Sequence, residues 1–193
     1  MILMLSAVVA GIVCGRFLGF HLPSELVTGL LMVLVFVVGL DVGGEEKILS
    51  SIKANIPLIL VQSSVTIGGT LLFAALGVLF LPLSLKEAMG VSAGFGWYSL
   101  SGVMISEMAS PFLGAVSFAA NIFREMIAIV CIPLLSRFSP LGSISLGGAA
   151  SMDVLVGLIA RHNSKKNTLV AFGQGVLVTL SVPVVISLFF RAG

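Results

Sequence analysis

The chain has 193 residues, of which 58% are hydrophobic and only 9% are charged, and its mean hydropathy is +1.21. This composition excludes an ordinary soluble protein and predicts an all-α integral membrane protein forming a single transmembrane domain, residues 1–193. The net charge of +2 gives no indication of a nucleic-acid-binding surface. Cys14 and Cys131 lack both a CxxC spacing and neighbouring histidines, so we expect neither a metal site nor a cofactor.

Apolar runs of about 20 residues are long enough to cross the hydrocarbon core of a membrane. In chain order these runs are residues 1–20, 24–41, 55–81, 112–138 and 168–190. Residues 86–106 and 144–160 are instead rich in Gly, Ala and Ser and carry acids, which is typical of re-entrant or broken helices. We therefore predict about five transmembrane helices and two such hairpins.

Lys and Arg predict the orientation, because cytoplasmic loops are enriched in them. With the N-terminus inside and the C-terminus outside, the inner loops hold Lys47, Lys53, Arg137, Arg161, Lys165 and Lys166, and the outer loops hold Arg16, Lys86 and Arg191. Seven spans, with both hairpins crossing fully, keep the same termini but move Arg137 outside. The distribution of Lys and Arg therefore favours five spans over seven, by one residue. We expect a multi-pass protein of the cytoplasmic (inner) membrane.

The first hairpin contains the only Trp and the only Tyr of the chain, Trp97 and Tyr98, close to Ser99 and Ser101. Such rings are common at membrane interfaces. Their position among glycines and serines favours an aromatic wall that receives an ammonium group through cation–π attraction. Glu107 closes this segment with a carboxylate at membrane depth.

Five ionisable residues lie at predicted membrane depth: Asp41, Glu107, Arg124, Glu125 and Asp153. Each costs roughly 2.5–3.5 kcal/mol at a helix centre, so the group requires a compensating role. One base cannot neutralise four acids, and the remaining negative charge is balanced either by protons or by a cationic guest. The cluster therefore predicts a transporter of a cationic solute.

Asn121, Arg124 and Glu125 project from one side of the predicted helix 112–138, because they are three and four residues apart. A structural ion pair between Arg124 and an acid of another helix is an equally good interpretation of that arginine. Asp153 follows Ser151 in a stretch of small residues without a nearby base, which favours function. The candidate substrate-binding residues are Trp97, Tyr98, Ser99, Ser101, Glu107, Asn121, Arg124, Glu125, Ser151 and Asp153.

Other polar residues in apolar runs are expected to be interhelical hydrogen-bond partners, namely Gln62, Ser63, Ser64, Thr66 and Gln174. The two hairpins also resemble one another, because Gly94–Glu107 and Gly147–Asp153 both run from glycines through small residues to an acid. This likeness points to a short internal repeat.

Three sequence blocks resemble the signature blocks of the LysO lysine exporter family: residues 92–102 (SAGFGWYSLSG), 120–129 (ANIFREMIAI) and 148–153 (GAASMD). The resemblance extends over the whole chain. It implies export of L-lysine, and of toxic lysine analogues, across the cytoplasmic membrane. It also implies that Glu125 and Asp153 are the transport residues.

Lysine carries two ammonium groups and one carboxylate, so acids would hold the amines. The helix N-termini of the hairpins, or Arg124, would hold the carboxylate. We expect Glu125 and Asp153 to bind lysine when deprotonated and to release it on protonation from outside, which makes protons the possible coupling ion. Bacterial members of the resembled family are commonly longer, with extra N-terminal spans, which implies a homodimer or a short companion membrane subunit.

Two other classes of function fit parts of the sequence. A cation-coupled carrier of another solute, for instance a sodium-coupled one, would use Ser, Asn and broken-helix carbonyls as ion ligands. An intramembrane hydrolase would use Asp41 and Asp153 as an aspartyl dyad. The chain lacks an HExxH motif and has no histidine at predicted membrane depth to activate a serine, so we do not expect an enzyme.

Overall fold

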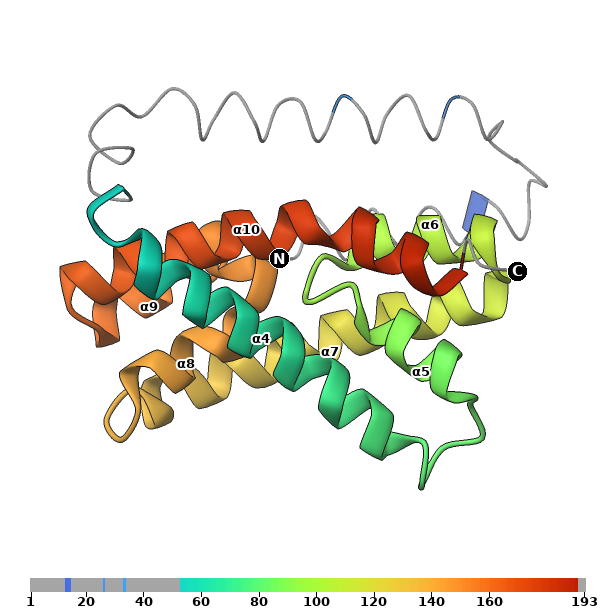
Figure 1. Cartoon of the computed structure of the whole chain (residues 1–193), viewed down its shortest axis with the longest axis horizontal. Coiled ribbons are helices and arrows are strands. Elements are labelled where there is room, and N and C mark those ends of the chain that lie inside the picture. The colour runs from blue at the N-terminus through green and yellow to red at the C-terminus, as the bar shows by residue number, and fades with distance from the viewer. Residues whose placement is uncertain (1–12, 15–25, 27–32, 34–52, 191–193) are drawn as a thin grey trace. The chain divides into compact units, whose positions relative to one another are not determined.

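The computed structural model describes residues 13–14, 26, 33 and 53–190 (Figure 1). The chain divides into two compact units, residues 1–45 and 46–193, and every element named below belongs to the second unit. Apart from the isolated described positions, the predicted spans 1–20 and 24–41 lie outside the described residues. Asp41 lies outside them as well.

Three long helices confirm the prediction of an all-α membrane protein. They are α4 (Ile56–Gly77), α7 (Pro111–Leu135) and α10 (Lys165–Phe190), and each is long and apolar enough to cross a membrane. They coincide with the predicted spans 55–81, 112–138 and 168–190. Within residues 53–190 every regular element is a helix and no strand occurs.

A broken helical hairpin lies at each of the two predicted places. The first consists of α5 (Leu85–Ser92) and α6 (Tyr98–Met108), and the second of α8 (Pro140–Gly147), the 3₁₀ helix η1 (Gly148–Met152) and α9 (Val156–His162). Figure 1 shows α5 and α6 in one half of the bundle and α8 and α9 in the other half. The hairpins therefore enter the bundle from opposite ends, and their tips meet near its middle.

Hydrogen bonds and close packing fix the ends of both hairpins. After α9, Asn163 Nδ2 donates to Ser136 Oγ at the end of α7 (3.0 Å) and lies 3.3 Å from Ser143 Oγ in α8, so the second hairpin leaves the bundle where it entered. In the first hairpin, α6 packs antiparallel against α7, and a Cβ on Gly102 would lie 3.1 Å from Phe118 Cβ. Small residues therefore allow α6 to return alongside α7.

Serine caps begin several of these helices. Ser84 forms a capping box with Glu87 at the start of α5. Ser110 and Ser139 cap α7 and α8, and each is followed by a proline at the first helical position. A serine oxygen satisfies an unpaired N–H of the first turn, and proline has no N–H to leave unpaired there. The local sequence therefore determines where each segment begins.

Apolar side chains cover the outside of the bundle, and its interior combines an apolar core with a set of buried polar side chains. The exposed apolar side chains of α4 and α7 include Leu60, Val61, Val65, Leu72, Phe73, Phe123, Ile127 and Val130. The buried polar residues include Gln62, Thr66, Ser117, Asn121, Gln174 and Thr179. In the most apolar 18-residue stretch of each long helix, 50% of α10 is buried, against 22% of α4 and 17% of α7. Helix α10 is therefore the most buried of the three. This distribution is the one expected in lipid.

The same order of elements occurs twice. A broken hairpin precedes α7, and a second broken hairpin, entering from the opposite end, precedes α10. Each tip contains a glycine with positive φ, Gly96 at 106° and Gly148 at 53°. Repeats of inverted topology that meet at discontinuous helices are a common transporter architecture. The order of elements is therefore the same in both halves of residues 56–190, and the short internal repeat in the sequence stays a prediction.

Candidate substrate site at the hairpin crossing

The two hairpin tips touch through their backbones. The Ala149 N–H donates to the Phe95 carbonyl oxygen over 2.9 Å. A Cβ on Gly148 would overlap that same oxygen, and a Cβ on Gly96 would lie 3.4 Å from the Gly147 carbonyl oxygen. Glycine is therefore required at position 148 both for its backbone conformation and for the space it leaves.

Asn121 of α7 holds the tip of the first hairpin. Its Oδ1 accepts the Gly96 N–H (2.7 Å), and its Nδ2 donates to the Ser117 carbonyl oxygen (2.8 Å) and lies 3.3 Å from Ser101 Oγ. Ser117 Oγ donates to the Val91 carbonyl oxygen in the last turn of α5 (2.8 Å). Asn121, Ser101 and Ser117 are all buried. Two predicted substrate contacts, Ser101 and Asn121, thus belong to the network that fixes this tip.

Replacing Asn121 by Ala is expected to destabilise the protein, because the buried Gly96 N–H loses its acceptor. An unsatisfied buried donor costs about 1–3 kcal/mol. The measurement is the thermal unfolding midpoint of the purified protein in detergent. Asn167→Ala, near the start of α10, is the matched control and should leave the midpoint unchanged. Equal midpoints for both variants would contradict the proposed role of Asn121.

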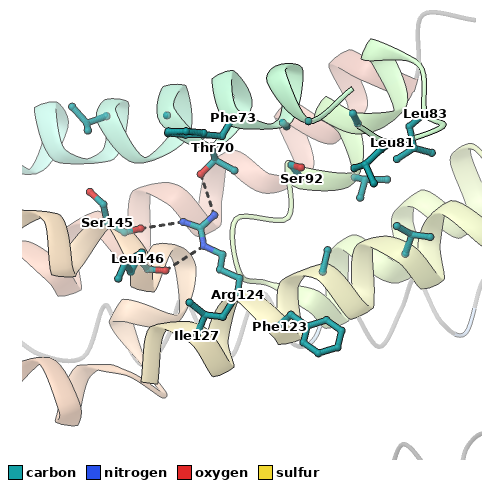
Figure 2. Close-up of a pocket in the computed structure, with 18 residues that line it drawn as sticks. Thr70, Phe73, Leu81, Leu83, Ser92, Phe123, Arg124, Ile127, Ser145 and Leu146 are labelled. Atoms are coloured by element: carbon teal, nitrogen blue, oxygen red, sulfur yellow. Dashed lines mark hydrogen bonds between the residues drawn. The ribbon is translucent and has the colours of Figure 1, made fainter. Parts of the chain in front are cut away.

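Arg124 holds the tip of the second hairpin (Figure 2). Its Nε donates to the Leu146 carbonyl oxygen (3.2 Å), its Nη2 to the Ser145 carbonyl oxygen (3.0 Å) and its Nη1 to Thr70 Oγ1 on α4 (3.0 Å). The two carbonyls belong to the last turn of α8, where a helix leaves its acceptors unpaired. Within residues 53–190 Arg124 has these neutral partners, and no ion pair with an acid of another helix is present there.

Gln174 and Gln62 complete the support of α8. Gln174 Nε2, on α10, donates to the Ile144 carbonyl oxygen (3.3 Å), and Gln62 Nε2, on α4, donates to the Leu141 carbonyl oxygen (2.7 Å) and to Ser145 Oγ (2.6 Å). Thr66 Oγ1 donates to Gln174 Oε1 (3.2 Å) between α4 and α10. The prediction of interhelical hydrogen bonds is therefore confirmed for Gln62, Thr66 and Gln174. It is wrong for Ser63, whose Oγ donates to the Ile59 carbonyl oxygen of its own helix (2.8 Å), and Ser64 is exposed.

Arg124 also lies at one end of a groove of about 720 Å³ between α4, α5, α7 and α8 (Figure 2). Most of the lining is apolar and includes Val65, Phe73, Leu81, Val91, Phe123 and Ile127. The polar side chains that line it are those of Thr70, Ser92, Arg124 and Ser145. Glu125 and Asp153 do not line this groove.

Ser151 is fully buried against α10. Its Oγ lies 2.7 Å from the Gly148 carbonyl oxygen and 2.8 Å from the Ala171 carbonyl oxygen. A Cβ on Gly175 would lie 2.6 Å from the Met152 backbone nitrogen, so η1 packs directly on the α10 backbone. The contacts of the Ser151 hydroxyl are therefore structural, and they position the segment that leads to Asp153.

Tyr98, Glu125 and Asp153 form the acidic cluster of the site. Glu125 lies two helical turns after Phe118 on α7, and Asp153 directly follows the tip segment that bonds Phe95, so the segments that carry the three groups meet at the hairpin crossing. Glu125 is half-buried on α7, and Asp153 is exposed directly after η1 and accepts the Val154 N–H. The Tyr98 ring packs edge-on against Phe118 with centroids 5.5 Å apart. The structure thus brings together three of the predicted substrate contacts.

The remaining predicted residues lie along α6. Trp97 is its N-cap residue and Ser99 is half-buried in its first turn, so both lie beside Tyr98. Glu107 is exposed near the other end of the helix, nine residues from Tyr98. At 1.5 Å per residue this separation is about 14 Å, which places Glu107 away from the acidic cluster.

Sequence reasoning missed the residues that make the crossing. Thr70, Phe95 and Gly148 were not predicted to contribute, although all three touch the tips or Arg124. Thr70 had a usable signal, because it lies one helical turn after Thr66 in an apolar run. The contact between Phe95 and Ala149 had no signal in the sequence, because it joins residues that are distant along the chain.

Comparison with known proteins identifies clear relatives. The profile of a family described as "Lysine exporter LysO" matches residues 5–190. The chain is 33% identical over 163 residues to the "Lysine exporter LysO" of Escherichia coli, covering 82% of this chain and 53% of that protein. It is 27% identical over 188 residues to the "Putative lysine exporter" of Haemophilus influenzae, covering 96% of each.

The chain therefore spans about half the length of the Escherichia coli relative and nearly all of the Haemophilus influenzae one. No solved structure matches the chain.

Proposed function

We propose that this chain, which belongs to the lysine exporter LysO family, exports L-lysine across the cytoplasmic membrane. The observation that carries the proposal is the acidic cluster beside the crossing of the two hairpins. A pair of carboxylates at membrane depth is costly unless it serves a cationic substrate or a proton. Discontinuous helices near the middle of the membrane are where transporters bind their substrates.

Lysine fits the chemistry of this cluster. Glu125 and Asp153 would hold its ammonium groups, and the Tyr98 ring would add cation–π attraction. The substrate carboxylate would lie at the N-terminus of α6, where Trp97 provides no side-chain cap and the helix dipole is positive. Arg124 is the less favoured partner for the carboxylate, because it lines a separate groove and already binds three oxygens.

Coupling to protons follows from the same residues. Deprotonated Glu125 and Asp153 would bind lysine from the cytoplasm, and protonation from outside would weaken that binding and release it. Toxic lysine analogues with the same ammonium groups would be exported by the same route. The proposal contains no catalytic step, in keeping with a family of exporters.

The test is lysine counterflow in liposomes that contain the purified protein. We expect labelled lysine to exchange with trapped unlabelled lysine, and lysine efflux to accelerate severalfold when the receiving side is acidic. Absence of exchange would reject lysine as the substrate. Exchange with no response to the pH gradient would remove the proton from the mechanism. Thermal shifts over a panel of amino acids and sodium would identify a carrier of another solute.

We propose that the transporter also contains a second copy of this chain or a short companion membrane subunit. The proposed topology has the N-terminus inside and the C-terminus outside, with Lys165 and Lys166 on the cytoplasmic side. The mass of the complex in native conditions distinguishes a dimer from a heteromeric assembly.

A further inference from the structure

The oxygens around the Arg124 guanidinium resemble a cation site. Two are backbone carbonyl oxygens from the end of a broken helix, those of Ser145 and Leu146, and the third is Thr70 Oγ1. Carbonyls at the C-terminal ends of half-helices and nearby hydroxyls are the groups that coordinate sodium in many coupled transporters. Here a positive charge of the chain itself occupies the position between them (Figure 2).

The surroundings of the guanidinium favour a cation independently of those bonds. It lies at the C-terminus of α8, where the helix dipole is negative. The second tip closes around it, because a Cβ on Gly148 would lie 3.0 Å from Arg124 Nη2. Its hydrogen-bond partners within residues 53–190 are neutral oxygens, so the dipoles of these groups stabilise the positive charge.

We propose that Arg124 is a built-in cation that takes the place of a coupling sodium ion at the helix break. Two consequences follow. Lysine export by the unmodified protein, which rests on the proposed function, does not require sodium. Removal of the Arg124 side chain leaves an oxygen-lined site for a small planar cation, which reaches it through the groove.

The first experiment measures lysine efflux from liposomes with sodium fully replaced by N-methylglucamine. The unmodified protein should work equally well in both media. Arg124→Ala should lose activity roughly tenfold or more, because charged hydrogen bonds to α8 are removed. Methylguanidinium at low millimolar concentration should restore part of that activity, and sodium should restore less. Arg137→Ala, at an exposed arginine after α7, is the matched control and should need no rescue.

The second experiment measures binding without transport. Methylguanidinium should raise the thermal unfolding midpoint of Arg124→Ala by a few degrees, and leave the unmodified protein and Arg137→Ala unchanged. Sodium dependence of the unmodified protein would overturn the proposal. The proposal would also be overturned if Arg124→Ala inserts into the membrane but methylguanidinium neither raises its unfolding midpoint nor restores its export activity.

The two proposals fail in different ways. If lysine is not transported at all, the proposed function fails, and the thermal shift still decides whether the cation site exists. If Arg124→Ala does not insert, the sodium response of the unmodified protein decides the matter. Arg124→Lys then provides a second arm, because it keeps the charge and should remain independent of sodium with reduced activity.

Discussion

Asp153→Asn is expected to abolish lysine export while leaving membrane insertion normal. The substitution keeps the shape of the side chain and removes its charge, so the ammonium group loses one of its two carboxylates. Loss of a charged hydrogen bond is worth about 1.5–3 kcal/mol, which corresponds to roughly 10- to 100-fold in rate or affinity. Asp153 is exposed at the end of η1, so the variant should fold. The measurement is lysine counterflow, normalised to the amount of inserted protein.

Two further variants make this test specific. Glu125→Gln should cause a comparable loss, because Glu125 is the second carboxylate proposed to hold the ammonium groups of lysine. Glu107→Gln is the matched control, since Glu107 is also a carboxylate of a hairpin but lies at the far end of α6. Retained export in Asp153→Asn, or an equal loss in Glu107→Gln, would assign the acids a structural role.

Gly148→Ala is expected to prevent stable folding of the hairpin crossing. The new methyl group would overlap the Phe95 carbonyl oxygen, and the backbone at φ 53° disfavours any residue with a Cβ. Strained backbone of this kind costs about 1–3 kcal/mol even without a clash, and the clash adds to that cost. We therefore expect a marked fall in the unfolding midpoint and loss of transport.

Gly157→Ala is the control for that substitution. Gly157 lies in α9, and a Cβ there would meet no atom within 4 Å. Alanine should be neutral or stabilise the helix by up to about 1 kcal/mol. If Gly148→Ala unfolded at the same temperature as Gly157→Ala, the close approach of the two tips would be wrong.

The helices were predictable because the sequence signals are local. The runs behind α4, α7 and α10 are long and apolar, and membrane thickness alone sets the required length. The hairpins were predictable because Gly, Ala and Ser replace large apolar residues between Leu85 and Met108 and between Pro140 and His162. Predicted and observed boundaries of α4, α7 and α10 differ by a few residues.

The roles of individual polar residues were less predictable. Asn121 and Glu125 are one helical turn apart on the same helix, and both were predicted to contact substrate. Asn121 accepts the Gly96 N–H and supports the tip of the first hairpin, whereas Glu125 has no such role and is half-buried. The difference arises from where the tip of the first hairpin crosses α7, which is a tertiary contact. Helical spacing determines the face of the helix on which a side chain lies, but not which residues of other segments that side chain contacts.

Arg124 shows the same limit. Its sequence context allowed either an ion pair or a substrate contact, and the structure shows it bonded to carbonyls of α8. Those carbonyls are available only because α8 ends at Gly147 in the middle of the bundle. A buried arginine in a membrane sequence therefore cannot be assigned a partner until the helix breaks around it are known.

The hydrogen bond from the Ala149 N–H to the Phe95 carbonyl oxygen links two hairpins that reach the centre from opposite ends of the bundle. If one tip withdraws toward its own face, the other tip must either follow it or break this contact. This single backbone hydrogen bond therefore couples the positions of the two hairpin tips.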